Sequence, residues 1–371
     1  MTGAPLDQGF RDPEIARDLA ARIRAQSTRP ARIMEVCGTH TMAIFRHGIR
    51  SLLPKTLTLI SGPGCPVCVT DQGDLDAFVE MARMPGVTIT SFGDLLRVPS
   101  SDSSLARERA RGADVRVVGS PAQALSLAQA EPGRTVVFLG VGFETTAPAV
   151  AATLLAARDR GVGNFLVFSA HKLVPPALFA LFGSGQCRVD GLLLPGHVSV
   201  ITGLAAFRPF FERFRVPSVV AGFEAGDILG ALAMLTDEIE SGTPILENAY
   251  ARAVTENGNP RAREIMNRVF VPKEARWRGL GAIPESGLAI REEFAAHDAA
   301  RVLGVPGREA PPPAGCRCGE VITGAVTPRE CPLFGRACTP SGPVGPCMVS
   351  TEGTCAAYFR FGRECCGGNP F

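Results

Sequence analysis

The sequence predicts an α/β protein in which two parallel-sheet (Rossmann-like) α/β domains are followed by a cysteine-rich C-terminal domain. Two observations lead to this prediction. Short apolar segments alternate with segments of helical periodicity in the first part of the chain, and the alternation restarts near residue 130. Eight of the twelve cysteines lie after residue 300, where apolar periodicity is lost. A segment of that composition needs metal ligation in place of an apolar core.

Residues 1–28 carry charges throughout and are predicted to form an N-terminal helical extension, and residues 29–130 are predicted to form the first α/β domain. Strands are expected where apolar residues cluster, and helices where they recur every three or four positions. Thr70 is the expected N-cap of its helix. The expected strands are 32–36, 56–60, 87–92 and 115–118, and the expected helices are 41–53, 70–84 and 121–130.

Residues 131–240 repeat the alternation and are predicted to form the second α/β domain. From about residue 240 the strand signals fade, so residues 241–371 are assigned to the C-terminal domain, with a stiff break at Pro311, Pro312 and Pro313. The expected strands of the second domain are 135–139, 165–168, 191–194 and 218–220, and its expected helices are 147–158, 175–182 and 225–239.

Composition and charge exclude several classes of protein. Hydrophobic residues make up 46% of the chain and charged residues 20%, which is a globular composition. The formal net charge is +2 and aromatic residues are scarce, so no nucleic-acid partner is expected. No apolar stretch has the length of a signal peptide or a membrane span, so we expect a cytoplasmic protein without membrane association. In that reducing compartment the cysteines indicate metal or redox chemistry.

Most of the reactive side chains directly follow predicted strands. Because ligands of open α/β sheets bind beyond the carboxyl ends of the strands, these side chains are expected on one rim. Three of the five histidines, His40, His171 and His197, are among them. The segments that follow the strands are 37–40, 62–68, 93–94, 142–146, 170–172, 195–197 and 222–224.

Cys65 and Cys68 form a CxxC motif in a Gly- and Pro-rich turn. This spacing brings two thiols within disulfide distance when the turn opens a helix, and the helix expected from Thr70 favours thiolate at its N-terminus. We interpret the pair as a redox dithiol or half of a metal site. The alternative is two buried small residues in a tight turn.

Cys37 lies three residues before His40, at the end of the preceding predicted strand. His40 can lower the pKa of the thiol or share a metal with it. The alternative is a buried cysteine beside a helix capped by Thr39. Taken alone the two interpretations are balanced, and the neighbouring CxxC motif favours the metal-binding thiolate.

The remaining candidates have plainer interpretations. The segment after Gly140 and Gly142 has Thr145 where a GxGxxG loop has its third glycine, so a helix start capped by Thr145 or Thr146 is preferred to a phosphate site. His171 and His197 are either ligands or general bases, or structural histidines held by hydrogen bonds. Cys187 has no partner in sequence and is expected to pack in the core.

Four cysteines of the tail, Cys331, Cys338, Cys347 and Cys355, are separated by six, eight and seven residues. These gaps are too long for a zinc knuckle, and four thiolates suit a [4Fe–4S] cluster. Zinc is the alternative. Cys316 and Cys318 either supply ligands too or form a separate redox pair.

Five motifs resemble the HypD family, in order and over nearly the whole chain. They are CGTHT at 37–41, GPGCPVC at 62–68, GFETTAP at 142–148, LPGHVSVI at 194–201 and CPLFGRACTP…GPCMVSTEGTCAAY at 331–358. The resemblance implies two α/β domains and a C-terminal [4Fe–4S] domain similar to that of ferredoxin:thioredoxin reductase. Cys365 and Cys366 lie beyond the motifs, so the resemblance gives them no role.

The resemblance also implies a function. HypD proteins act in the maturation of [NiFe]-hydrogenases, where with the small chaperone HypC they hold the iron that receives two cyanides and one carbon monoxide. A HypE-type protein delivers cyanide as a thiocyanate, and the Fe(CN)2CO unit then passes to the hydrogenase large subunit. This describes an assembly scaffold with redox-active thiols and no classical independent turnover.

Carried onto this sequence, the resemblance implies that Cys37 binds the iron, that His40 tunes or orients this site, and that Cys65 and Cys68 store two electrons. The [4Fe–4S] cluster is expected on Cys331, Cys338, Cys347 and Cys355. Two alternatives stay open: a stand-alone dithiol and iron–sulfur oxidoreductase of the ferredoxin:thioredoxin reductase type, and a zinc-stabilised binding protein.

Overall fold

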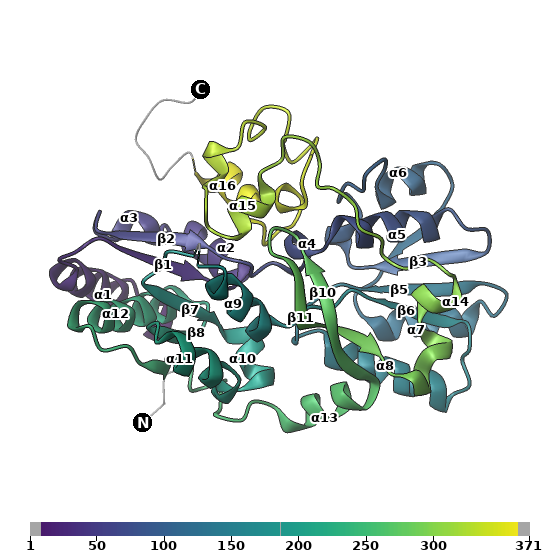
Figure 1. Cartoon of the computed structure of the whole chain (residues 1–371), viewed down its shortest axis with the longest axis horizontal. Coiled ribbons are helices and arrows are strands. Elements are labelled where there is room, and N and C mark those ends of the chain that lie inside the picture. Colours follow the sequence, from purple (N-terminus) through teal and green to yellow (C-terminus); the bar gives the residue numbers. More distant parts are fainter. Residues whose placement is uncertain (1–8, 186, 363–371) are drawn as a thin grey trace.

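The computed structural model describes residues 9–185 and 187–362, and it shows two parallel β-sheets, a long antiparallel hairpin and a cysteine-rich segment. Figure 1 shows the sheets at the left and right, the hairpin between them, and the cysteine-rich segment above their junction. The predicted class, α/β with parallel sheets and a cysteine-rich C-terminal region, is confirmed. Within the described ranges no helix has the length and apolar character needed to cross a membrane.

The first sheet has five parallel strands in the order β2-β1-β7-β8-β9. Its central strands are almost completely buried, as expected of a parallel sheet covered on both faces. The strands are β1 (Ala31–Glu35), β2 (Leu57–Ser61), β7 (Gly191–Pro195), β8 (Ser218–Ala221) and β9 (Leu246–Asn248). The helices around them are α1 (Pro13–Gln26), α2 (Gly38–Arg46), α3 (Ile49–Leu52), α9 (Val174–Gly183), α10 (Gly196–Thr202), α11 (Arg208–Phe214) and α12 (Ala225–Ser241).

The second sheet has four parallel strands in the order β4-β3-β5-β6. Its strands are β3 (Val87–Ser91), β4 (Asp114–Val117), β5 (Thr135–Gly140) and β6 (Phe165–Ser169). Its helices are α5 (Gln72–Ala82), α6 (Leu105–Ala110), α7 (Pro121–Ala130) and α8 (Ala147–Asp159).

The sheets do not follow the expected division into residues 29–130 and 131–240. After β2 the chain leaves the first sheet, builds all of the second, and returns at β7, which pairs with β1. Strands that are buried on both faces read as uniform apolar segments, and such segments carry no signal for which neighbour they pair with. The order along the chain therefore gave the wrong grouping of strands.

The hairpin of β10 (Phe270–Trp277) and β11 (Gly281–Ile290) lies in the region assigned to the C-terminal domain. Four consecutive residues of β10 are exposed, and the register of its pairing with β11 shifts between Lys273 and Ala275. The alternation of buried and exposed residues that marks a strand in sequence is therefore weak. The hairpin bridges to Thr70 and Lys172, and α13 (Pro260–Val269) and α14 (Ala299–Val302) flank it. Residues 241–310 thus connect the sheets, and the cysteine-rich segment begins after them.

Two helix starts differ from expectation. α5 begins at Gln72 and is capped by Asp71, whose carboxylate accepts the Gly73 N–H at 3.1 Å, whereas Thr70 donates to the Pro66 carbonyl. The helix expected over 41–53 begins at Gly38 and is divided into α2 and α3 at Gly48, which has a φ of +62°. The cysteine-rich segment itself holds α15 (Cys318–Ile322) and α16 (Thr354–Phe361).

Candidate functional site

The Cys37 and CxxC segments follow β1 and β2, which are paired in parallel from Ala31 and Leu57 to Glu35 and Ser61. The Gly38 N–H donates to the Gly64 carbonyl at 2.9 Å, and a Cβ atom at Gly64 would overlap the Cys37 backbone nitrogen. A Cβ atom at Gly38 would lie 3.3 Å from Cys65 Cβ. Glycine at these two positions therefore allows the iron-site candidate and the redox candidate to pack backbone to backbone.

Cys65 and Cys68 are joined by a disulfide, with their Cα atoms 5.2 Å apart. Both are buried. Cys65 caps a short helix, α4 (Pro66–Val69), and its Sγ accepts the Cys68 N–H at 3.2 Å. The helix that the motif opens is thus α4 rather than the longer helix expected from Thr70. The pair is in the form that remains after two electrons have left a dithiol.

Cys37 is only 8% exposed and occupies the N-cap position of α2. Burial and the nearby Glu352 carboxylate raise the pKa of its thiol to about 11, against the opposing effect of the Thr39 and His40 backbone amides. A thiol of this kind stays protonated at neutral pH unless a cation replaces the proton. A bound metal ion does so, because it removes the proton of a coordinating thiol outright.

His40 is fully buried and turns its ring toward β8 rather than acting on Cys37 as a cation. Its Nε2 lies 2.9 Å from the Gly222 carbonyl oxygen, which can only accept, so Nε2 carries the proton. Burial lowers the pKa of His40 to about 4, and the ring stacks on Phe223 at 4.8 Å. His197 stacks on Phe223 at 3.9 Å. The imidazole is therefore neutral, and it holds the rim of β1 against that of β8.

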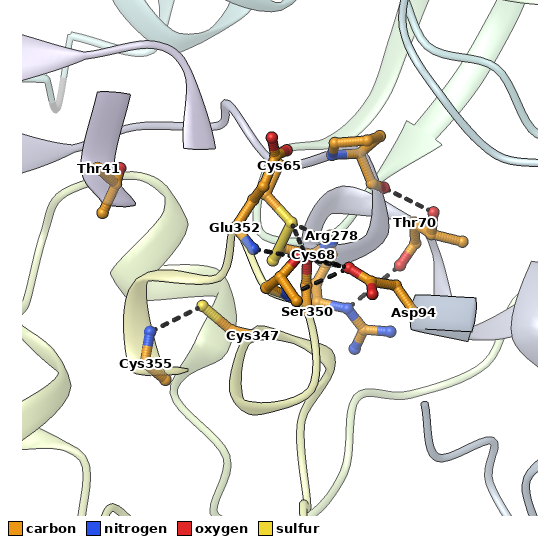
Figure 2. Close-up of a disulfide and its surroundings, with 12 residues drawn as sticks. Thr41, Cys65, Cys68, Thr70, Asp94, Arg278, Cys347, Ser350, Glu352 and Cys355 are labelled. Atoms are coloured by element: carbon orange, nitrogen blue, oxygen red, sulfur yellow. Dashed lines mark hydrogen bonds between the residues drawn. A yellow bond between two sulfur atoms is a disulfide. The ribbon is translucent and has the colours of Figure 1, made fainter. Parts of the chain in front are cut away.

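Residues 350–352, which sequence reasoning missed, join the cysteine-rich segment to both candidate sites. The Thr39 hydroxyl bonds to the Glu352 carboxylate at 2.5 Å, and the Ser350 hydroxyl lies 3.3 Å from Cys65 Sγ. Asp94, at the end of β3, accepts the Thr351 N–H at 3.1 Å. Figure 2 shows Ser350 between the disulfide and Asp94. Cysteine spacing drew attention to the thiols of this segment, and the polar residues between them gave no periodic signal.

The six tail cysteines within the described residues line one small cavity in the cysteine-rich segment. They are the four predicted ligands Cys331, Cys338, Cys347 and Cys355 together with Cys316 and Cys318. Backbone N–H groups of Val344 and Cys355 donate to the Cys338 and Cys347 sulfurs at 3.3 and 3.2 Å. Cys365 and Cys366 lie outside the described residues.

The donor set of this cavity fits an iron–sulfur cluster. Among residues 9–185 and 187–362 no three His, Cys, Asp or Glu side chains are already placed as a metal site. Six gathered thiols, some receiving N–H bonds, are nevertheless the soft ligands that such clusters take. A hydrogen bond with Cys318, together with burial, raises the pKa of the Cys316 thiol, so this thiol stays neutral while no cation is near. Assignment of the cluster to Cys331, Cys338, Cys347 and Cys355 stays a prediction.

The other sequence candidates lie outside the Cys37 and CxxC segments. His171 bonds through Nδ1 to the Ser169 hydroxyl at 3.1 Å, and burial lowers its pKa to about 3. Thr146 is the residue before α8, as expected for a helix start, although its hydroxyl donates to the Phe143 carbonyl. Cys187 is partly buried and lines a cavity with Cys316 and Cys318.

Glu144 gives a prediction for the pH dependence of stability. It is 2% exposed, one carboxyl oxygen accepts the Val174 N–H at 2.9 Å, and burial raises its pKa to about 7. The folded chain therefore holds a proton that the unfolded chain releases above pH 4.5, so stability falls as pH rises from 4.5 to 7. Between pH 4.5 and 7 the wild type should therefore lose about 3 kcal/mol of unfolding free energy through this group. The Glu144→Gln variant should not show that loss. Urea titrations at several pH values, with exposed Glu293→Gln as control, test this; parallel wild-type and Glu144→Gln curves would contradict it.

A comparison with known protein families decides the relationship. A family model named HypD, described as "Hydrogenase formation hypA family", matches residues 14–362. The chain belongs to the HypD family. Its relatives include the hydrogenase maturation factor HypD of Azotobacter vinelandii, 47% identical over 364 residues that cover 96% of each chain. The HypD of Escherichia coli K12 is 44% identical over 353 residues, covering 95% of this chain and 94% of its own. The resemblance found in the motifs is confirmed.

Proposed function

We propose that this chain is a hydrogenase maturation factor that holds an iron unit on Cys37 while its cyanide and carbon monoxide ligands are installed. The observation that carries the proposal is the close backbone packing of the Cys37 segment against the segment of the Cys65–Cys68 disulfide, at the ends of two paired strands. Membership of the HypD family, whose model is described by hydrogenase formation, supplies the class of process.

The dithiol supplies the electrons that cyanide transfer needs. A protein thiocyanate and two thiols give a protein thiol, hydrogen cyanide and a disulfide, so one Cys65–Cys68 pair balances one cyanide. Because Cys65 packs beside Gly38, the cyanide is released next to the thiol that carries the iron. A short path favours capture of the cyanide by the iron over its loss to solvent.

The cysteine-rich segment is proposed to hold a [4Fe–4S] cluster, which would supply or accept single electrons. The chain itself places residues 350–352, three positions beyond Cys347, against Thr39 and Cys65. Residues 350–352 therefore connect the cysteine cavity to both the Cys37 segment and the CxxC segment. Proposed partners are a HypC-type chaperone, which contributes a second iron-binding thiol, a HypE-type thiocyanate carrier, and indirectly the hydrogenase large subunit.

Infrared spectroscopy of the anaerobically purified complex with the HypC-type chaperone tests this function. We expect cyanide and carbonyl stretching bands, together with a low-spin iron signal in the Mössbauer spectrum. The second candidate, a free-standing dithiol oxidoreductase, is favoured by the disulfide alone. It predicts reduction of thioredoxin or insulin by the isolated chain and a complex without diatomic bands, and that pair of results would overturn the assembly function.

A further inference from the structure

Asp94 and Ser350 connect the buried disulfide with the solvent-facing side of the junction. Ser350 is 2% exposed, and its hydroxyl lies 3.3 Å from Cys65 Sγ and 3.4 Å from the Asp94 Oδ2 atom. Asp94 itself is only partly buried. Figure 2 shows the three groups in sequence, with a dashed line at each step. A hydroxyl between a sulfur and a carboxylate is the arrangement of a proton path.

Cys65 is the sulfur better placed to carry negative charge when the disulfide opens. Its Sγ accepts the Cys68 N–H at 3.2 Å, and it lies 3.3 Å from the oxygen of Ser350, whose hydroxyl donates to Asp94, so a backbone donor and a hydroxyl oxygen adjoin this sulfur. Hydrogen bonds to the charged form favour that form. Cys65 is thus the leaving thiolate on reduction, and it needs a proton because its surroundings are buried.

We propose that Asp94 and Ser350 are positioning residues that relay a proton to and from Cys65; the inference rests on the redox use of Cys65 and Cys68 proposed above. A thiolate of a dithiol reductant attacks Cys68, the disulfide bond breaks, and the electron pair stays on Cys65. Ser350 passes its proton to Cys65 and takes one from Asp94, which Asp94 takes from solvent. The second reductant thiol loses its proton to solvent and displaces Cys68. Cys68 takes a solvent proton, so two electrons and two protons enter the pair.

The other charged groups around this path are engaged elsewhere. The Glu352 carboxylate bonds to Thr39, and only its backbone N–H reaches the Ser350 hydroxyl, at 3.2 Å. The buried guanidinium of Arg278 donates to the Thr70 carbonyl and to Gln72. The carboxylate that faces Ser350 is therefore that of Asp94.

Rates of thiol–disulfide exchange in the isolated full-length chain test the relay. The Cys65–Cys68 pair is reduced by dithiothreitol and re-formed by oxidised dithiothreitol, and alkylation with mass spectrometry measures both rates and the equilibrium. A proton relay changes the two rates equally and leaves the equilibrium unchanged. In Asp94→Asn we expect both rates to fall roughly 100-fold, the size of one general acid–base contribution, with Ser350→Ala slowed in the same direction. Added formate should restore the rates of Asp94→Ala.

Two matched controls separate the relay from simple anchoring of residues 350–352. Thr351→Val removes a 2.9 Å hydrogen bond to Asp94 without breaking the proton path, and Asp102→Asn removes a carboxylate that pairs with Arg83. Both should react at the wild-type rate. Wild-type rates in Asp94→Asn would overturn the relay, and so would slowing with a shifted equilibrium and no formate rescue. These assays contain neither iron nor partner. Absence of the infrared bands would therefore contradict the proposed function and would not contradict the proton relay.

Discussion

Cys37→Ala is expected to abolish iron loading in the complex with the HypC-type chaperone, and with it the cyanide and carbonyl bands. The reason is that Cys37 is the thiol placed at the end of β1 against the CxxC segment, and its pKa of about 11 leaves it protonated until a metal ion displaces the proton. An alanine fits the same buried N-cap position but offers no ligand. Iron analysis and infrared spectra of the co-purified complex measure the effect.

Cys187→Ala is the matched control for this experiment. Cys187 is also a free cysteine; it is partly buried, burial raises the pKa of its thiol to about 11, and the cavity that it lines does not include Cys37. It should load iron normally. The visible absorbance of the proposed cluster should survive in both variants, because neither Cys37 nor Cys187 lines the small cavity shared by the six tail cysteines. Normal iron loading of Cys37→Ala would remove this residue from the site.

Cys338→Ala is expected to lose the visible absorbance of the reconstituted cluster and to destabilise the cysteine-rich segment. The Cys338 sulfur lines the shared cavity and receives the Val344 N–H, so its removal takes away a ligand and leaves a backbone donor without its partner. The segment has little apolar periodicity, and metal ligation is the proposed substitute for a larger core. Absorbance, acid-labile sulfide and limited proteolysis of the full chain measure the two effects.

Cys316→Ala and Cys318→Ala distinguish the ligands. If Cys331, Cys338, Cys347 and Cys355 form the set, these two variants keep the cluster spectrum. A spectrum that survives in Cys338→Ala and disappears in Cys318→Ala would instead place Cys318 among the ligands. The shared cavity makes this comparison necessary, since all six thiols line it.

The sequence was sufficient for the fold class and for placing the Cys37 segment beside the CxxC segment. Both follow from local rules, since alternating apolar segments indicate parallel sheets and the ends of neighbouring strands share a rim. The grouping of strands could not be predicted, because the pairing of β1 with β7 joins residues nearly 160 positions apart and depends on burial that every central strand offers equally.

Residues 350–352 and the ring of His40 show a second limit. Ser350 and Asp94 meet only after the cysteine-rich segment has packed over the second sheet, and neither residue belongs to a spaced motif. The hydrogen bond from His40 Nε2 to the Gly222 carbonyl had no signal in the sequence, and the predicted action of His40 on the Cys37 site stays a prediction. Contacts made by single polar side chains across the fold have no periodic trace in the sequence.

The return of the chain to β7 has a consequence for biosynthesis. β1 gains its second neighbour only when residues 191–195 have been made, and β8 and β9 follow still later. On a ribosome the rim that carries Cys37 therefore stays open on one side until more than half of the polypeptide has emerged. A nascent chain therefore displays these thiols before β7 can pair with β1, so the proposed iron site is completed only after the middle of the chain has been translated.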